Sequence, residues 1–298
     1  MDERSPYVIT GATGYIGRRL CNRLVEMGAE VYCLIRLPRS SSTDLPAEVI
    51  QWPWRGEFAD VISLFKLLGN RKPVIVHLAA RAVLREQFIN EDIKGIVEAN
   101  LELGLFLLEA ATKIGCKKFI NTGSYWQYSR GSEPYSNSTY AATKNAFDQL
   151  IDHHVYHRGL VATSLVLTDV YGPDDPRNKV FSQLIQHDYL GEDFKTTPGE
   201  QEMNFIHIDD VIEAYLVSMD TSSCEESPVH SKYFVAAEES IKLKEALNLL
   251  HELMRSSIKI QWGAKIYEEH QIMTPYVGEH VPNWRANISL REGLISLL

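Results

Sequence analysis

Short β-branched runs alternate with longer helix-period segments through the first half of the chain, and this alternation restricts the fold more than any other feature. Strand-like runs fall at Tyr7–Thr10, Val31–Ile35, Val74–His77, Lys118–Thr122 and Val161–Leu167. Helical segments lie between them at about Ile16–Met27, Phe58–Leu68, Ile93–Ile114 and Tyr140–His157. Because strands that alternate with helices form βαβ crossovers, the pattern predicts an α/β fold, a Rossmann-type doubly wound parallel sheet with helices on both faces.

The pattern loosens after Val170, where prolines divide the chain into shorter pieces. Helices are expected near Lys179–His187, Asp209–Met219 and Ile241–Arg255. We therefore expect residues 1–170 to form the sheet domain, which the chain re-enters around 205–220, and residues 171–298 to form a smaller substrate-binding lobe. Such a lobe would lie over the carboxyl edge of the sheet, where open α/β folds bind their ligands.

Composition argues against several classes of protein. With 298 residues, of which 45% are hydrophobic and 23% charged, the chain has the usual composition of a globular protein. The formal net charge of −9 argues against a nucleic-acid-binding or anionic-membrane-binding role. Neither a signal peptide nor an apolar stretch of about 18 residues is present, which predicts a cytoplasmic protein. The four cysteines form no C-x-x-C pair, so no metal site is expected.

A glycine-rich loop follows the first predicted strand directly. Gly11, Gly14 and Gly17 form G-x-x-G-x-x-G and lead into a predicted helix. Glycines there allow a tight turn and let backbone N–H groups approach a pyrophosphate at the helix N-terminus. The position between a strand and a helix predicts a dinucleotide-binding loop, and the alternative is a glycine-rich turn without a ligand.

The end of the second predicted strand indicates which dinucleotide is bound. An NAD site usually has an acid there, which accepts hydrogen bonds from the ribose hydroxyls. In this chain Val31–Ile35 is followed by Arg36, and Arg39 comes soon after in a polar loop. Arginine pairs well with a 2′-phosphate, so we expect NADP, as NADPH, bound to residues 1–170. A solvated basic loop is the alternative.

Tyr140 and Lys144 form Tyr-x-x-x-Lys at the start of a predicted helix, and this spacing places both side chains on one helix face. A nearby ammonium, and an oxidised nicotinamide when present, favour the phenolate and should move the phenol pKa from about 10 toward the working range. Tyr140 would then give a proton to a carbonyl oxygen whose carbon receives hydride. Ser124, just after the strand Lys118–Thr122, would hydrogen-bond the same oxygen. Tyr-x-x-x-Lys alone is common by chance, but its combination with the serine and the glycine loop is specific.

These motifs resemble those of the extended short-chain dehydrogenase/reductase family, which includes nucleotide-sugar epimerases, dehydratases and 4-ketoreductases. Further matches are His77–Ala80, Asn100, Val170–Pro173, His207–Val211 and Trp284–Gly293. The resemblance implies that Ser124, Tyr140 and Lys144 are the catalytic residues. Together with the motifs, it assigns cofactor binding to Gly11, Thr13, Gly14, Tyr15, Ile16, Gly17, Arg36, Arg39, Leu78, Ala79, Ala80, Asn100, Tyr140 and Lys144. An ordinary helix contact is the alternative for Asn100. A homodimer through the helices at Ile93–Ile114 and Tyr140–His157 is also implied.

Departures from the family pattern indicate the branch. Dehydratases carry Thr-Asp-Glu where this chain has Ser124-Tyr125-Trp126, so loss of water is not expected. Epimerases usually have an acid after the second strand, and an asparagine where this chain has Asp169. The run Asn121–Tyr128 instead looks like bacterial nucleotide-linked 4-keto-6-deoxyhexose reductases, a group that includes CDP-abequose and CDP-paratose synthases.

Substrate contacts are expected at Tyr125, Trp126, Asp169, Arg177 and Lys179. The two basic residues are the candidates to replace an arginine that binds diphosphate in many members and is Met203 here. Simple packing is the alternative for the two aromatic residues, and a charged loop for the basic pair.

The resemblance therefore predicts an NADPH-dependent reductase of the C4 ketone of a CDP-, dTDP- or GDP-linked 4-keto-6-deoxy sugar, in deoxysugar and lipopolysaccharide biosynthesis. Two alternatives remain open at this stage. One is a nucleotide-sugar epimerase without net redox change. The other is a catalytically silent NADP-sensing or scaffold protein, although such a protein would not need an intact Ser124, Tyr140 and Lys144.

Overall fold

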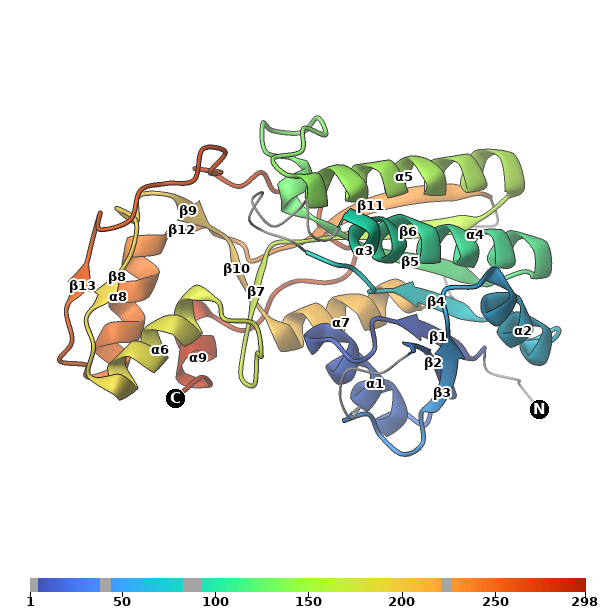
Figure 1. The fold of residues 1–298 in the computed structure, drawn as a ribbon, viewed down its shortest axis with the longest axis horizontal. Helices are drawn as coiled ribbons and strands as arrows, with labels where there is room; N and C mark the ends of the chain where they lie inside the picture. The colour runs from blue at the N-terminus through green and yellow to red at the C-terminus, as the bar shows by residue number, and fades with distance from the viewer. Residues whose placement is uncertain (1–4, 38–43, 83–92, 221–226) are drawn as a thin grey trace.

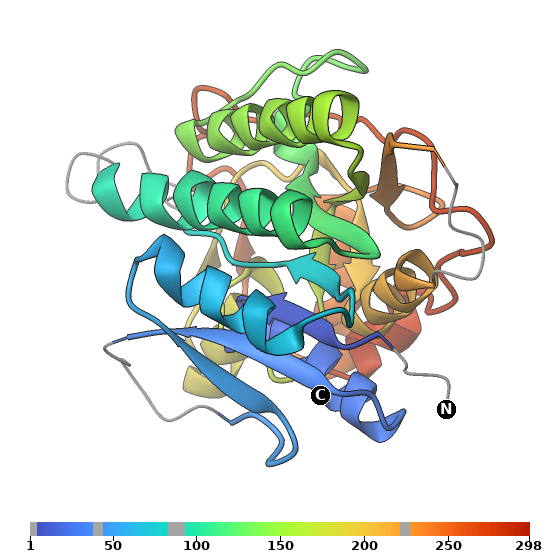
Figure 2. The ribbon, with the colours of Figure 1, turned by 90° about the vertical axis from the view of Figure 1, so that its right-hand side faces the viewer.

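The computed structural model describes residues 5–37, 44–82, 93–220 and 227–298. Its centre is a seven-stranded sheet in the order β11-β6-β5-β4-β1-β2-β3, with every neighbouring pair parallel (Figures 1 and 2). The strands are β1 Tyr7–Thr10, β2 Val31–Arg36, β3 Ile50–Trp54, β4 Val74–His77, β5 Lys118–Ser124, β6 Val161–Leu167 and β11 Val229–Val235. The structure thus confirms the predicted Rossmann-type α/β fold.

Helices cover both faces of this sheet. On one face lie α1 (Tyr15–Glu26) and α7 (Ile208–Met219), and on the other α2 (Phe58–Leu68), α4 (Leu103–Ile114) and α5 (Thr139–Arg158), as Figure 2 shows. Each helix buries a stripe of apolar residues spaced three or four apart, such as Leu20 and Leu24 in α1 and Phe147 and Ile151 in α5. Burial of these stripes against the strands produces two large apolar cores, one on each face.

The helix expected at Ile93–Ile114 is interrupted by a π-helical turn. The segment consists of α3 (Ile93–Val97), the turn Glu98–Glu102, and α4. Asn100 lies within this turn and is 1% exposed. π-helical turns in α-helices are frequent at functional sites, because they displace a side chain from the regular helix face.

Two strands of the seven-stranded sheet were not predicted from the sequence, and both are its edge strands. β3 contains Pro53, which cannot donate a ladder hydrogen bond and is tolerated at an edge. β11 carries His230, Ser231 and Lys232 in succession, which hides the apolar pattern of a buried strand. Both strands therefore lack the sequence signal on which the other five were predicted.

A smaller lobe lies beyond the carboxyl edge of the sheet (Figure 1). Its helices and strands are α6 Val180–Leu190, β8 Phe194–Lys195, β9 Glu202–Met203, β12 Ile241–Lys242, α8 Leu243–Met254, β13 Ile260–Gln261 and α9 Leu290–Ile295. Its core is formed by apolar residues of α6, α8 and α9, including Leu184, Leu247 and Leu294. The pair β7 (Asp169–Tyr171) and β10 (Phe205–His207) joins the lobe to the sheet.

The chain returns to the sheet over a longer stretch than the expected 205–220. After β10 it forms α7 and then β11, which pairs with β6 over its full length. Helix α7 and strand β11 therefore belong with the sheet, and the proposed lobe consists of the segments between β7 and β10 and after β11. Within the described ranges, no helix is long and apolar enough to cross a membrane.

Candidate active site

At two positions of the glycine loop, neighbouring backbone atoms lie so close that a side chain cannot be accommodated. Gly11 has φ +68°, and a Cβ there would lie 2.6 Å from the backbone nitrogen of Ala79. A Cβ on Gly17 would lie 2.2 Å from the carbonyl oxygen of Gly11. Thr13 and Gly14 are exposed, and Ile16 is half-buried at the start of α1. The loop thus leads to the N-terminus of α1, whose first backbone N–H groups have no intrahelical acceptor, and this fits a dinucleotide pyrophosphate.

Tyr15 joins this loop to the segment that enters the smaller lobe. Its ring is 5% exposed, and its hydroxyl donates to the carbonyl of Pro173 at 3.0 Å. The guanidinium of Arg177 lies over the ring, 4.8 Å from its centroid. Because the side chain is engaged in this way, a cofactor contact of Tyr15 would come from its backbone N–H, which has no intrahelical acceptor at the first helical position.

The end of β4 lies directly beside the glycine loop. Thr10 Oγ1 accepts from the backbone N–H of Ala79 at 3.2 Å and contacts His77 Nδ1 at 2.8 Å. Leu78 and Ala79 are half-buried and Ala80 is exposed, so this strand end borders the opening. The structure therefore brings His77–Ala80 to the loop, as the sequence analysis expected of cofactor-lining residues.

Asn100 connects the segment after β4 to helix α5. Its Oδ1 accepts from the backbone N–H of Arg81 at 2.7 Å, and its Nδ2 donates to Thr143 Oγ1 at 2.9 Å. Thr143 directly precedes Lys144 on α5. Asn100 therefore orders backbone and side chain next to Lys144.

Arg36 lies at the end of β2, as expected from the sequence. Its guanidinium contacts a carboxylate from another element of the fold. Its Nη2 lies 2.7 Å from Glu98 Oε2 in the π-helical turn. Lys94 lies 3.6 Å from the same carboxylate. Arg39 lies outside the described residues. Glu98 was missed from the sequence because it is 62 positions from Arg36 and no local pattern relates the two.

Ser124, Tyr140 and Lys144 come together at the carboxyl end of β5 and the start of α5. Ser124 Oγ accepts from the backbone N–H of Trp126 at 3.3 Å, and the Trp126 ring lies edge-on to the Tyr140 ring with centroids 6.5 Å apart. Lys144 Nζ lies 5.9 Å from the centroid of the Tyr140 ring. Lys144 is 2% exposed and Tyr140 half-buried. Serine, phenol and ammonium therefore share one region of the sheet edge.

Burial shifts the pKa values of Tyr140 and Lys144 in opposite directions. Burial raises the pKa of Tyr140 to about 12, and the nearby Arg177 guanidinium only partly opposes this. Burial lowers the pKa of Lys144 to about 8, with Asp148 opposing. In the protein without cofactor the phenol pKa is not lowered, because burial destabilises the phenolate more than nearby cations stabilise it. The expected lowering, which included an oxidised nicotinamide, stays a prediction for the cofactor-bound protein. The phenol stays protonated at neutral pH.

Four of the expected substrate residues surround the start of β7. Burial raises the pKa of Asp169, while Lys179, a hydrogen bond from Tyr125 and Arg177 all lower it. The Lys179 ammonium and the Arg177 guanidinium both donate to the carbonyl of Val170, at 3.3 and 3.2 Å. Asp169 Oδ2 is buried and has no hydrogen-bond partner within the described part of the chain. An acid with a free oxygen thus lies among two cations and a tyrosine.

Met203 lies in the short strand β9 and packs against the core of the smaller lobe. Its register partner is Ile241 of β12. The position has no polar group with which to bind a phosphate. Arg177 also faces Tyr140, and Asp175 holds its guanidinium through contacts of 2.7 and 2.6 Å.

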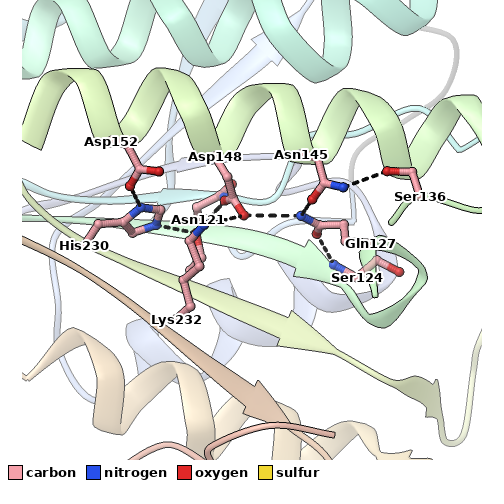
Figure 3. A network of polar contacts seen from close by, with 10 residues as sticks. Asn121, Ser124, Gln127, Ser136, Asn145, Asp148, Asp152, His230 and Lys232 are labelled. Atoms are coloured by element: carbon pink, nitrogen blue, oxygen red, sulfur yellow. Dashed lines mark hydrogen bonds and ion pairs between the residues drawn. The ribbon is translucent and has the colours of Figure 1, made fainter. Parts of the chain in front are cut away.

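A buried polar network behind Ser124 was not identified from the sequence (Figure 3). Gln127 Oε1 accepts from the backbone N–H of Ser124 at 2.8 Å, and its Nε2 donates to Asn145 Oδ1 at 2.8 Å and to Asp148 Oδ2 at 3.2 Å. Gln127 is 0% exposed and Asp148 2%. The network fixes the backbone that carries Ser124. Only the four-residue spacing from Lys144 to Asp148 could have indicated it.

The family of the chain follows from comparison with known proteins. The profile of the NAD dependent epimerase/dehydratase family matches residues 7–230. CDP-abequose synthase of Yersinia pseudotuberculosis is 27% identical over 277 residues, covering 90% of this chain and 90% of the relative. A dTDP-4-dehydro-6-deoxy-D-allose reductase of Streptomyces bikiniensis is 27% identical over 248 residues, covering 74% of each chain. The crystal structure of UDP-glucose 4-epimerase from Thermotoga maritima superimposes with a TM-score of 0.84 at 21% identity, covering 97% of this chain and 96% of that one. The chain belongs to the NAD dependent epimerase/dehydratase family, whose members form part of the extended short-chain dehydrogenases/reductases.

Proposed function

We propose that this protein is an NADPH-dependent reductase of the C4 ketone of a nucleotide-linked 4-keto-6-deoxy sugar. The observation that carries the proposal is the grouping of Ser124, Tyr140 and Lys144 around Trp126 at the carboxyl end of β5, with Tyr125 and Trp126 where a dehydratase would have two acids. A protonated phenol is the form that donates a proton to a developing alkoxide. The names of the CDP-abequose synthase and allose reductase relatives support the same branch.

In the proposed mechanism, the Ser124 hydroxyl and the Tyr140 phenol bind the ketone oxygen. The cofactor, when bound, supplies the hydride. Tyr140 then donates its proton to the oxygen as negative charge develops there, and Ser124 stabilises the same oxygen through its hydrogen bond. Lys144 would hold the nicotinamide ribose. Its positive charge would also stabilise the phenolate that Tyr140 becomes after it donates its proton. The cofactor contacts are proposed at the residues that the sequence analysis named, with the glycine loop at the pyrophosphate.

Substrate binding is proposed at the charged group around β7. Arg177 and Lys179 lie close enough to Asp169 to influence its pKa, and together they provide two cations for the diphosphate that Met203 cannot bind. Tyr125 and Trp126 are proposed to contact the sugar. We also propose a homodimer through α4 and α5, which lie side by side on one face of the sheet (Figure 2).

An absorbance assay at the nicotinamide wavelength tests the reaction directly. The enzyme is mixed with NADPH and each of a panel of CDP-, dTDP- and GDP-linked 4-keto-6-deoxyhexoses. We expect stoichiometric loss of NADPH with one of them and the corresponding 4-hydroxy sugar as product. A sugar that isomerises at C4 without loss of NADPH would establish the epimerase instead. No change across the panel would overturn the proposed substrate class.

Cofactor preference is expected to depend on Arg36 and on the acid that holds it. Arg36→Ala should weaken NADPH binding by about 1.5–3 kcal/mol, roughly 10- to 150-fold, and leave NADH binding nearly unchanged, because only NADPH carries the 2′-phosphate. Glu98→Gln should strengthen NADPH binding, since it frees the guanidinium and removes a like charge from the phosphate. Both effects are measured as dissociation constants by nicotinamide fluorescence.

Arg71, which lies between α2 and β4, provides a matched control. It lies beside the amino end of β2, opposite the end that carries Arg36, and contacts Glu30 Oε2 at 2.6 Å. Arg71→Ala should leave both dissociation constants unchanged. Equal loss of NADPH and NADH binding in Arg36→Ala would contradict the NADPH assignment.

A further inference from the structure

Asp148 on α5 is a buried carboxylate surrounded by hydrogen-bond donors (Figure 3). Its Oδ1 accepts from Asn121 Nδ2 at 3.2 Å and from Ser164 Oγ at 2.9 Å. Its Oδ2 accepts from Gln127 Nε2 at 3.2 Å and lies 3.3 Å from Lys232 Nζ. An ionised carboxylate only accepts hydrogen bonds, so these four donors suit the charged form and fix its orientation.

Lys144 lies one helical turn before Asp148, so the two side chains occupy the same face of α5. Burial alone disfavours the ammonium, and Asp148 is the group that opposes this effect on the Lys144 pKa. His77 on β4 also faces Lys144, but burial lowers its pKa to about 3, so it carries no charge at neutral pH. Tyr140 on α5 is protonated and uncharged in the same range. The charge of Asp148 therefore acts on Lys144 without competition from these two neighbours.

Lys232 adds a cation to the other side of the same carboxylate. It comes from the edge strand β11, where its register partner is Ser164, and its side chain is 30% exposed. Further along the network, His230 Nε2 contacts Ser164 Oγ at 2.8 Å, and its Nδ1 contacts Asp152 Oδ1 at 2.6 Å. Asp148 thus lies between two lysines, one in the active site and one at the sheet edge.

We propose that Asp148 is a positioning residue that keeps Lys144 in its charged form, and that Lys232 limits this effect by neutralising part of the Asp148 charge. The inference rests on the proposed role of Lys144 at the nicotinamide ribose. It explains why a lysine so deeply buried can serve as an ammonium. It also connects Lys232, on the edge strand β11, to the charge state of Lys144.

The test measures NADPH affinity across neutral and alkaline pH by nicotinamide fluorescence, without a sugar. Affinity should fall as Lys144 loses its proton, with a midpoint near the Lys144 pKa of about 8. Asp148→Asn removes the stabilising carboxylate, so its midpoint should move down by about 1 pH unit. Lys232→Gln leaves that carboxylate unbalanced, so its midpoint should move up. Asp148→Glu restores the charge and should bring the midpoint back toward that of the wild type.

Midpoint shifts of opposite sign indicate an electrostatic role, because structural damage would shift the midpoints of both variants in the same direction. Glu252→Gln is the control, because it removes a carboxylate charge from α8 in the smaller lobe, where Glu252 contacts Arg291 outside this network, and it should leave the midpoint unchanged. If Asp148→Asn does not fold, Lys232→Gln carries the test alone. Equal midpoints, or shifts of one sign, would overturn the proposal. Since no sugar is used, the result is independent of which substrate the enzyme turns over.

Discussion

Replacing Tyr140 with phenylalanine is expected to lower kcat for ketone reduction by about 10²–10⁴-fold, because the site loses the group that donates the proton. NADPH affinity should change little, since the phenyl ring keeps the packing of the phenol against Trp126. Turnover is followed by nicotinamide absorbance, and binding by nicotinamide fluorescence. The expected result is a loss in kcat with an almost unchanged dissociation constant.

Tyr156 offers a matched control on the same helix. Its side chain is 77% exposed, and Tyr156→Phe removes the same hydroxyl far from the sheet edge. This variant should retain full activity. Normal turnover by the Tyr140→Phe protein would show that another group donates the proton and would disprove the mechanism.

Gly11→Ala is expected to abolish measurable NADPH binding, a loss of more than about 100-fold. The new methyl group would need a left-handed backbone at φ +68° and would lie 2.6 Å from the backbone nitrogen of Ala79. Since neither backbone segment can move without opening the end of β4, the loop can no longer approach the pyrophosphate. Fluorescence titration with NADPH measures the loss, and thermal unfolding measures the accompanying decrease in stability.

Gly28→Ala separates backbone strain from the steric overlap. Gly28 follows α1 with φ +73°, but no atom lies within 4 Å of the added Cβ. The substitution should cost about 1–2 kcal/mol of stability and leave NADPH binding intact. If both variants lost NADPH binding equally, backbone strain in this region would explain the loss, and the close contact with Ala79 would not.

The parts of the site that were predictable from the sequence are those encoded by local patterns. Gly11–Gly17 lies directly between a strand and a helix, and the four-residue spacing of Tyr140 and Lys144 is a property of one helix. Ser124 ends a strand that the apolar pattern already indicated. The central strands were predictable for the same reason, because both of their faces are buried and their residues are almost continuously apolar.

The remaining features depend on contacts between distant segments. Glu98 reaches Arg36 across the sheet edge, and Lys232 reaches Asp148 from a strand whose polar residues hide its burial. The pKa of Tyr140 could not be predicted from its spacing to Lys144, because the dominant cause is burial, which the fold as a whole produces. A motif therefore identified which groups participate, whereas the three-dimensional packing determines their charge states.

The position of β11 has a consequence for the order in which the protein assembles. The chain completes β6, leaves the sheet to form part of the smaller lobe, and only then returns through α7 to add β11. During synthesis, Asp148 therefore emerges long before Lys232, and burying its carboxylate without that positive charge would be costly. We expect α5 to dock firmly only after β11 has paired, because such a long-range pairing is a slow step in folding. The polar interior that supports α5 would then be among the last parts of the sheet domain to form, and partly synthesised chains would be inactive.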